Sequence, residues 1–296
     1  MIRRPPRSTQ SRSSAASDVY KRQLWLCNHV VGFPDINQKV HGSMIDLLQK
    51  FPLPPAAERE DYDQFHGFHP AHERPIWVYK PYKKMTELEG KRRRMLLHAR
   101  ASMKTSVNTI AHSVQWIINY PEVIILLVQS TDDKSSENLN GILKIWRAQL
   151  TFRELFPEHV PWVSPFAFGT KSRMRTMCAP MDTVTKESYT VKATSILKGE
   201  AGGRAHVIKF SDIVDEKNSK TSSGLEMVRQ KMNYYIPLLI TPEYWIDVEG
   251  TRYHHLDAYG KIWESQRDLP EEEREWLFHA KGCYVKKLRD GKPLQG

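Results

Sequence analysis

The stretch that most constrains the fold is 95–106, which reads Met-Leu-Leu-His-Ala-Arg-Ala-Ser-Met-Lys-Thr-Ser. A short apolar run is followed by a loop of mostly small residues, by Lys104-Thr105-Ser106 and by a segment with helical apolar spacing. Strand, loop and helix N-terminus in this order place backbone N–H groups and an ammonium around a phosphate. The usual phosphate loop has glycines where His98 and Met103 stand here. Taken alone, the stretch therefore indicates only a Lys-Thr pair behind a strand.

The first 23 residues differ in composition from the rest of the chain. They are rich in Ser and Arg, hold six basic residues and one acid, and show no apolar period. This composition predicts a disordered basic arm, and the stretch also resembles a translated sequencing-adapter tail that is no part of the fold. A nucleic-acid-binding arm is the alternative. No apolar run follows the arginines, so the stretch lacks the form of a secretory signal.

The net charge outside this arm is modest. The whole chain carries +10 and residues 1–23 carry +5 of it, so the remaining 273 residues carry about +5. That balance is compatible with contact to DNA but is not evidence for it. The densest basic cluster is Lys91 with Arg92-Arg93-Arg94. We interpret this cluster as the solvated start of a strand, in preference to a contact with a phosphate backbone.

The body of the chain is long enough to bury one large core. Its longest apolar run, Val123–Val128, is too short to cross a bilayer, so no membrane partner is expected. The three cysteines are widely spaced and odd in number, which indicates a reducing compartment without a disulfide framework.

Apolar periodicity predicts strands that alternate with helices. The expected strands are 76–82, 94–98, 123–128, 189–197, 207–210 and 244–248, and the expected helical segments are 24–53 (broken near 32–34), 104–120, 132–150 and 224–235. The apolar, largely β-branched run at 123–128 suits a central parallel strand buried on both faces. Turn-rich stretches at 58–75 and 156–165 are expected to be loops.

This alternation implies an α/β fold with a parallel-centred sheet flanked by helices, a three-layer αβα architecture, behind a small N-terminal helical segment. In such sheets ligands bind at the carboxyl ends of the strands. Lys104-Thr105 follows one expected strand, Asp212 follows a second and Gly250-Thr251 follows a third. We therefore expect these residues to meet at one edge of the sheet.

Nucleotide hydrolysis needs only a few kinds of group. A lysine and backbone N–H groups bind the β- and γ-phosphates, a hydroxyl and an acid hold Mg²⁺ with its water shell, and a second acid orients the attacking water. Lys104 and Thr105 fit the first roles. The segment 206–216 offers Asp212, Asp215 and Glu216 as acids.

These motifs, in this order, resemble the ATPase half of the terminase large subunit of tailed bacteriophages. Arg100–Ser106 resembles the family's variant phosphate loop, which opens with an arginine and often has a residue other than Gly before the lysine. The segment 203–214 resembles the acidic Walker B segment, and 250–254, Gly-Thr-Arg-Tyr-His, resembles the coupling motif. The resemblance covers residues 24–265 and also includes 24–44, 119–131, 155–158, 218–221, 257 and 259–260.

The resemblance implies a P-loop NTPase fold and assigns roles to the residues that match. The nucleotide-binding residues would be Arg100, Ala101, Ser102, Met103, Lys104, Thr105 and Ser106. Lys104, Asp212 and Glu216 would be catalytic, Thr105 and Asp212 would hold the metal, and Gly250 and Thr251 would couple hydrolysis to movement. Arg100, Arg173 and Arg175 are rival candidates for an arginine finger.

The acidic segment departs from the family's pattern. The family usually has two adjacent acids at the end of this strand, and here the pair is Ser211-Asp212. In one register Asp212 orients the water and Ser211 replaces the metal-shell Asp. In the other register Asp212 is the metal-shell acid, and Asp215 or Glu216 is the base. Asp212 is expected to be essential in both registers.

The resemblance implies a motor ATPase that uses ATP and Mg²⁺ to move double-stranded DNA into a procapsid. The implied partners are the DNA, the portal protein, the small terminase subunit and sister subunits in a ring. The implied location is the host bacterial cytoplasm, in a packaging complex that is no component of the mature virion. The alternatives are a degenerate nucleotide- or DNA-binding assembly protein, or another P-loop motor such as a helicase.

Four segments follow from the patterns and the resemblance together. Residues 1–23 are the tail, 24–85 an N-terminal helical and linker segment, 86–265 the ATPase core, and 266–296 the start of a linker toward a nuclease domain that the sequence does not contain. No cluster of metal-binding acids of the ribonuclease-H type stands in 266–296. Nuclease activity is therefore not expected.

Overall fold

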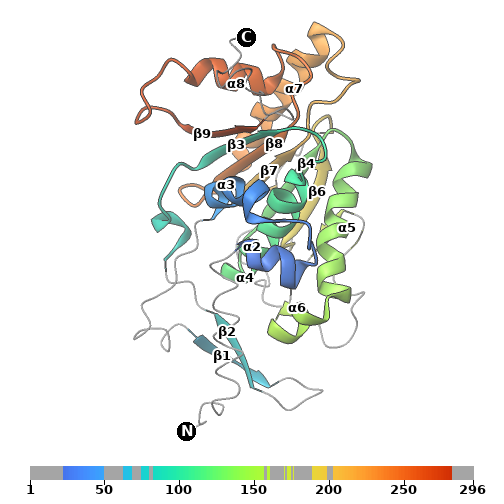
Figure 1. Cartoon of the computed structure of the whole chain (residues 1–296), viewed down its shortest axis with the longest axis vertical. Coiled ribbons are helices and arrows are strands. Elements are labelled where there is room, and N and C mark those ends of the chain that lie inside the picture. The colour runs from blue at the N-terminus through green and yellow to red at the C-terminus, as the bar shows by residue number, and fades with distance from the viewer. Residues whose placement is uncertain are drawn as a thin grey trace, which may run out of the picture.

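A seven-stranded sheet organises the protein (Figure 1). The computed structural model describes residues 23–49, 63–68, 75–79, 83–156, 159–160, 170, 172–174, 176, 189–198 and 203–281. The strands of the sheet are β3 (Arg93–His98), β4 (Ile125–Gln129), β5 (Arg173–Met174), β6 (Val191–Ser195), β7 (Val207–Ser211), β8 (Trp245–Gly250) and β9 (Trp276–Lys281). Their order is β5-β6-β4-β7-β8-β3-β9, and all neighbours are parallel except β5 and β6.

Strand β4 shows why this sequence forms a parallel sheet. All five of its residues are buried, and it pairs in parallel with β6 on one side and β7 on the other. Ile125 and Leu127 point into one apolar cluster, whereas Leu126 and Val128 point into the other. Both faces of the strand therefore need apolar side chains, which explains the uninterrupted run in the sequence.

Helices cover both faces of the sheet (Figure 1). One face carries α2 (Gln23–Trp25), η1 (Leu26–Val31), α3 (Gln38–Leu48), η4 (Thr105–Ala111), α4 (His112–Asn119), α5 (Asp132–Ala148) and α6 (Leu150–Leu155). The other face carries α7 (Ser222–Tyr235) and α8 (Ala258–Gln266), and the short turns η3 (Met85–Glu87) and η6 (Ile236–Leu238) complete the set. The predicted three-layer αβα architecture, with a helical N-terminal segment, is confirmed.

Helix boundaries follow the local sequence signals. The Thr131 side chain caps α5 by accepting a hydrogen bond from Lys134 N, and Thr221 caps α7 in the same way through Gly224 N. Asp257 caps α8 through Gly260 N. The helix that follows Lys104 ends at Asn119, two residues before Pro121, as the proline predicts.

Three features differ from the sequence predictions. The stretch 58–75, expected to be a loop, contains β1 (Asp63–Phe68), which forms an antiparallel hairpin with β2 (Pro75–Tyr79). The expected helix at 104–120 begins as the π-helix η4 before continuing as α4. Strand β9 pairs in parallel with β3 and extends the sheet into 266–296, the segment predicted to be a linker. An edge strand bounded by charged residues lacks the apolar run that identifies β4.

The described residues include only some of the boundaries between the predicted segments. Gln23, the last residue of the predicted tail, is buried and its Nε2 donates to Val107 O at 2.9 Å. The other tail residues, the loop residues 161–165 and part of the 155–158 motif lie outside the described residues. No helix in the described part of the chain is long and apolar enough to span a membrane.

Candidate nucleotide site

The loop between β3 and η4 contains two non-glycine residues with positive φ. Met103 occupies the position of the second glycine in the usual pattern and has φ of 54°, in the left-handed region that glycine favours. Ala101 has φ of 61°. Together with Asp212, at φ of 45°, these are the non-glycine residues with positive φ in the described part of the chain. Strained backbone therefore gathers at one edge of the sheet, as is typical of functional sites.

The Lys104 side chain is buried and connects two neighbouring strand ends. Its Nζ donates to Thr251 Oγ1 at 3.2 Å and lies 3.3 Å from Asp212 Oδ2. The Thr251 hydroxyl in turn donates to His98 O, at the end of β3, at 3.2 Å. Because β8 lies between β3 and β7, residues from three consecutive strands meet here. The sequence expectation that Lys104, Asp212 and Thr251 converge agrees with these contacts.

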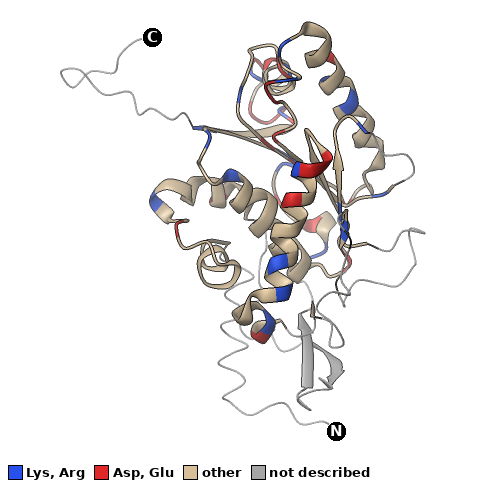
Figure 2. Cartoon of the chain, turned by 90° about the vertical axis from the view of Figure 1, so that its right-hand side faces the viewer, with Lys and Arg blue, Asp and Glu red and all other residues tan. Residues whose placement is uncertain are grey.

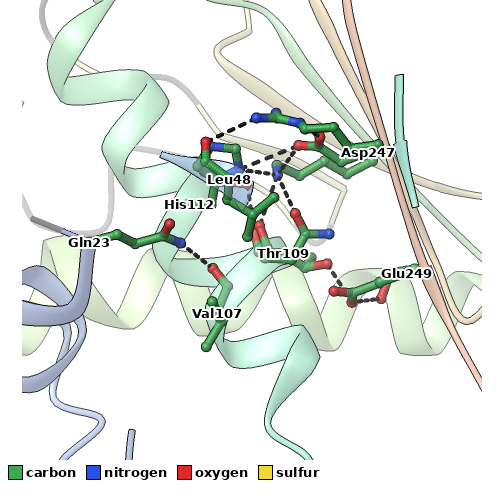
Figure 3. Close-up of polar contacts among 12 residues, drawn as sticks. Gln23, Leu48, Val107, Thr109, His112, Asp247 and Glu249 are labelled. Carbon is green, nitrogen blue, oxygen red and sulfur yellow. Dashed lines mark hydrogen bonds and ion pairs between the residues drawn. The ribbon is translucent and has the colours of Figure 1, made fainter. Parts of the chain in front are cut away.

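A second group of polar side chains comes from the residues just before Asp212 and Gly250 and from η4, and we call it the hydroxyl cluster: Thr109, Ser211 and Glu249. Figure 3 labels Thr109 and Glu249. Glu249 is fully buried and is the register partner of Ser211 across β7 and β8. Its Oε1 accepts hydrogen bonds from Ser211 Oγ at 2.5 Å and Thr109 Oγ1 at 2.7 Å. Burial raises the pKa of Glu249, and the two hydroxyl donors oppose that shift.

A third group, which we call the charged cluster, consists of Lys209 and Asp247, two residues earlier on β7 and β8, together with Arg94 of β3 and His112 of α4. Figure 3 labels His112 and Asp247. All four side chains are fully buried. Asp247 accepts from Lys209 Nζ and from Arg94 Nε, each at 2.7 Å. Burial alone would raise the pKa of Asp247, but the two cations hold it well below its usual range.

The π-helix η4 lets neighbouring residues serve both clusters. His112 N donates to Val107 O, five residues earlier, and Asn108 O accepts from Lys209 Nζ at 2.8 Å. Thr109, the next residue, reaches Glu249. Adjacent residues of this wider turn therefore contact β7 and β8, one strand each.

His112 is neutral in this environment. Lys209 carries only donors, so the contact of 3.0 Å between its Nζ and His112 Nδ1 requires that Nδ1 accept the hydrogen bond. Burial and the charge of Lys209 lower the pKa of His112 to about 3. The cluster therefore holds two cations and one anion around an uncharged imidazole.

The predicted coupling residues are held from both sides. A Cβ on Gly250 would lie 2.4 Å from Tyr259 Cζ, so only glycine fits against this buried ring. The Tyr259 hydroxyl accepts from Val214 N at 3.3 Å, which fixes the ring against the loop behind Asp212. Beyond Thr251, Arg252 Nε pairs with the buried Asp257 at 2.9 Å and closes the following turn.

The other predicted nucleotide-binding residues lie around Lys104. Arg100 is exposed, its Nη2 donates to the Tyr253 hydroxyl, and its guanidinium lies 5.2 Å from the Tyr253 ring centroid. The Ser102 hydroxyl is buried without a hydrogen-bond partner in the described part of the chain. Thr105 is the first residue of η4 and Ser106 the second, so both stand at the helix start that faces a bound anion.

The two acids downstream of Asp212, Asp215 and Glu216, have partners other than Lys104. Glu216 is exposed and pairs with Lys220 at 3.3 Å. Asp215 accepts backbone hydrogen bonds from Lys217 and Asn218, both at 3.0 Å, which stabilise the loop. The structure therefore brings Asp212, and neither of these acids, into contact with Lys104. Glu216 as a catalytic residue stays a prediction.

The basic cluster before β3 is engaged inside the protein. Arg94 is fully buried in the charged cluster, Arg93 pairs with Glu275, and Arg92 donates to Met85 O and Thr86 O. The interpretation as a solvated start of a strand is therefore wrong for Arg94. On the side of the molecule in Figure 2, Lys and Arg are interspersed with Asp and Glu and form no single basic face.

Sequence reasoning missed Glu249, which directly precedes the predicted coupling motif. The available signal was the pattern Asp247-Val-Glu249 in an expected strand, since acids at alternating positions on a buried strand need partners. Its identification needed the register of β7 and β8, which the sequence does not contain.

The donors at this edge are compatible with Mg²⁺ bound together with a nucleotide. In the described residues no group of three or more His, Cys, Asp and Glu side chains is placed to hold a metal. Mg²⁺ in phosphate sites is held through one or two carboxylates, substrate phosphates and waters. Asp212 and the Thr105 hydroxyl are the candidate direct or water-mediated ligands. The buried Glu249 Oε2, which has no hydrogen-bond partner in the described part of the chain, supports a cation nearby.

Comparisons with known proteins add little to this description. No protein-family model matches the chain, and no curated protein does. Among solved structures, the chain is similar to a mutant of the large terminase ATPase domain of Thermus phage P74-26, with a TM-score of 0.41 and 13% sequence identity. The similarity covers 69% of this chain and 82% of that one. At this TM-score the likeness carries no weight for function, and the site rests on its own geometry.

Proposed function

We propose that this chain hydrolyses ATP with Mg²⁺ and uses the energy to translocate double-stranded DNA during phage genome packaging. One observation carries the hydrolase part: the buried Lys104 ammonium, behind a loop with positive φ at Ala101 and Met103, contacts Asp212 and Thr251 from two neighbouring strands. The packaging part rests on the ordered sequence motifs that resemble the terminase large subunit.

Each residue at the edge has a role that its geometry supports. Lys104 binds the phosphates, because a phosphate offers its Nζ a stronger partner than the Thr251 hydroxyl at 3.2 Å. The backbone N–H groups at the start of η4 add to this anion site. Asp212 is the acid nearest the phosphates, where it either orients water or holds the metal shell. When bound, Mg²⁺ would neutralise the charge that develops on the phosphates.

Thr251 is suited to report the state of the site. Its hydroxyl bridges Lys104 Nζ and His98 O, so a phosphate that draws Lys104 away changes the hydrogen bonding between β8 and β3. Gly250 is locked against Tyr259, and Tyr259 is bonded to the loop behind Asp212. A change at Lys104 therefore has a continuous packed route to the segment 250–257.

The partners follow from the packaging proposal. DNA contacts would be made mainly to phosphates, so binding should be sensitive to salt and indifferent to sequence. The portal protein, the small terminase subunit and further copies of this chain in a ring would complete the motor in the host bacterial cytoplasm. Arg100 is exposed beside the phosphate loop and is available either to the phosphates or to a neighbouring copy.

The test is ATP hydrolysis by the full chain with Mg²⁺, with and without duplex DNA. Lys104→Ala should abolish turnover, whereas Lys144→Ala, on the exposed side of α5, should leave it unchanged. Stimulation by DNA would support a packaging motor. Absence of nucleotide binding by the wild-type chain would contradict the proposal.

A second candidate function is a nucleotide-binding assembly protein that does not hydrolyse ATP. The observation in its favour is Ser211, which stands where the family resemblance implies a metal-shell acid. Tight binding of ATP without turnover, in the presence of DNA and at concentrations that permit self-association, would favour this candidate.

A further inference from the structure

The two oxygens of the Glu249 carboxylate have unequal surroundings. Oε1 accepts two hydrogen bonds, from Ser211 and Thr109, whereas the buried Oε2 has no hydrogen-bond partner in the described residues. A neutral carboxyl can carry its proton on Oε1 and donate it to the Ser211 hydroxyl, which leaves Oε2 as a buried acceptor that no described group bonds. If the group is ionised, its charge is buried without a bonded cation. Either form therefore carries the cost of an unsatisfied buried polar atom.

The position of Glu249 coincides with that of the acid that the sequence lacks. Ser211 ends β7 and is paired in register with Glu249 on β8. The Ser211 hydroxyl oxygen lies 2.5 Å from Glu249 Oε1, which is one short hydrogen bond of the kind a hydroxyl makes to a carboxylate. An aspartate at 211 would extend from the same Cβ. A carboxylate is therefore present at the end of β7, but it comes from the neighbouring strand.

Glu249 is also joined to the residues that face the phosphates. Asp212 N donates to Glu249 O at 2.9 Å, and Asp212 Oδ2 lies 3.3 Å from Lys104 Nζ. Ser211 Oγ accepts from Gln129 Nε2 at 3.3 Å, so the hydroxyl retains one lone pair. The carboxylate, its hydroxyl relay and the proposed metal acid therefore form one connected group.

We propose that Glu249 is a positioning residue for the divalent cation of the bound nucleotide, supplying through Ser211 the negative charge that an aspartate at 211 would supply. The proposal rests on the proposed function, since it needs a nucleotide at Lys104. A cation at this edge balances the uncompensated oxygen. This accounts for a buried carboxylate in which only one of the two oxygens is hydrogen-bonded by described residues.

The decisive measurement is the affinity of the full chain for a fluorescent, non-hydrolysable ATP analogue, in excess Mg²⁺ and again in EDTA. Glu249→Gln keeps the shape and the hydrogen-bond acceptor but removes the charge. We expect affinity in Mg²⁺ to fall about 10- to 100-fold, the usual effect of losing a group that supports a metal ligand, with less than a twofold change in EDTA. Mn²⁺ binding to the analogue complex, followed by electron paramagnetic resonance, should weaken in parallel.

Three further variants separate charge from structure. Thr109→Val removes one donor but keeps the carboxylate, so its effect in Mg²⁺ should be smaller than that of Glu249→Gln. Glu264→Gln removes an exposed charge on α8 and should change neither affinity. In the double variant Ser211→Asp with Glu249→Gln, the carboxylate returns to β7, and Mg²⁺-dependent affinity should recover to within about threefold of wild type.

The outcomes distinguish this proposal from the proposed function. Wild-type affinity of Glu249→Gln in Mg²⁺ would overturn the role of Glu249 while leaving nucleotide binding intact. Equal losses in Mg²⁺ and EDTA would show a structural role only and would also overturn it, as would a folded double variant without recovery. If the wild-type chain binds the analogue in neither medium, the proposed function itself fails.

Discussion

The charged cluster and the hydroxyl cluster lie one after the other on the same face of β7 and β8, but the buried carboxylates at their centres differ in how they are compensated. Lys209 pairs with Asp247 in register, and two residues later Ser211 pairs with Glu249. Asp247 is compensated by two cations, Arg94 and Lys209. Glu249, equally buried, receives two hydroxyl groups on one oxygen and nothing on the other in the described part of the chain.

From this difference we infer that Asp247 is a structural acid, whereas Glu249 is the acid proposed to support a bound cation. Both oxygens of Asp247 are bonded to cations, so this carboxylate holds one arrangement of strands and helix and has no capacity left for a ligand. A buried acid left half satisfied lowers stability unless something arrives to complete it. The positive-φ residues support the same division, because Ala101, Met103 and Asp212 all lie around the hydroxyl cluster's end of the strands.

The largest expected effect is that of Asp247→Asn. The substitution leaves the buried Arg94 and Lys209 without a counter-charge, so the free energy of unfolding should fall by about 3–5 kcal/mol. Urea-induced unfolding followed by circular dichroism measures the change. Glu249→Gln is the matched control and should leave stability unchanged or raise it. Equal destabilisation by the two substitutions would break the comparison.

Gly250→Ala tests whether the end of β8 can be disturbed while the charged cluster inside the sheet stays intact. The new methyl group would meet the Tyr259 ring, which its bond to Val214 N holds in place. We expect a loss of about 1–3 kcal/mol in the free energy of unfolding and weaker nucleotide binding. Gly141→Ala is the control, because its methyl group meets only the flexible end of Ile110 and should be nearly neutral. Similar losses for both would argue against a rigid Gly250–Tyr259 contact.

The charged cluster also predicts how stability depends on pH. Burial lowers the pKa of His112 to about 3 from an ordinary value of 6.5, so below pH 6.5 the unfolded chain binds a proton that the folded chain excludes. The free energy of unfolding should therefore fall as the pH drops from 6.5 toward 3, by about 1.4 kcal/mol per pH unit from this residue.

His112→Gln removes this titration, and urea unfolding at pH 7, 6 and 5 compares the slopes. The slope in the variant should be shallower but not zero, because burial lowers the pKa of His98 to about 4 and acts in the same direction. Identical slopes in variant and wild type would mean that His112 is not buried as a neutral group.

The sequence predicted the part of the site that depends on order along the chain. Lys104, Asp212 and Thr251 each follow a strand, and parallel strands bring such residues to one edge whatever their exact register. Glu249 and Arg94 were not predictable in this way. Their roles depend on which residues pair across β3, β7 and β8 and on which face they point, and a shift of one residue would reverse the answer.

The elements that were not predicted from the sequence were missed for a similar reason. Strand β9 lies at the sheet edge and carries partly exposed residues, so it lacks the apolar run that identified β4. Strand β2 matches the predicted strand at 76–82, whereas its partner β1 lies outside the main sheet in a stretch whose polar, turn-rich sequence predicted a loop. The π-helix at 105–111 has ordinary helical spacing in the sequence, and its wider turn goes together with contacts to Lys209 and Glu249, which lie on strands far along the chain.

The smallest expected effect is that of Ala101→Gly, and it bears on the strain at the hydroxyl cluster's end of the sheet. Ala101 is exposed and has φ of 61°, a conformation that costs an ordinary residue about 1–2 kcal/mol. Glycine removes this cost in the folded state, but it also makes the unfolded chain more flexible, which cancels part of the gain in stability. The free energy of unfolding should therefore rise by up to about 1 kcal/mol. Met103→Gly, at a similar φ, should gain less, since Met103 packs against the apolar core. A loss of stability in Ala101→Gly would mean that this loop is not strained, and would remove the link between strain and the half-satisfied acid.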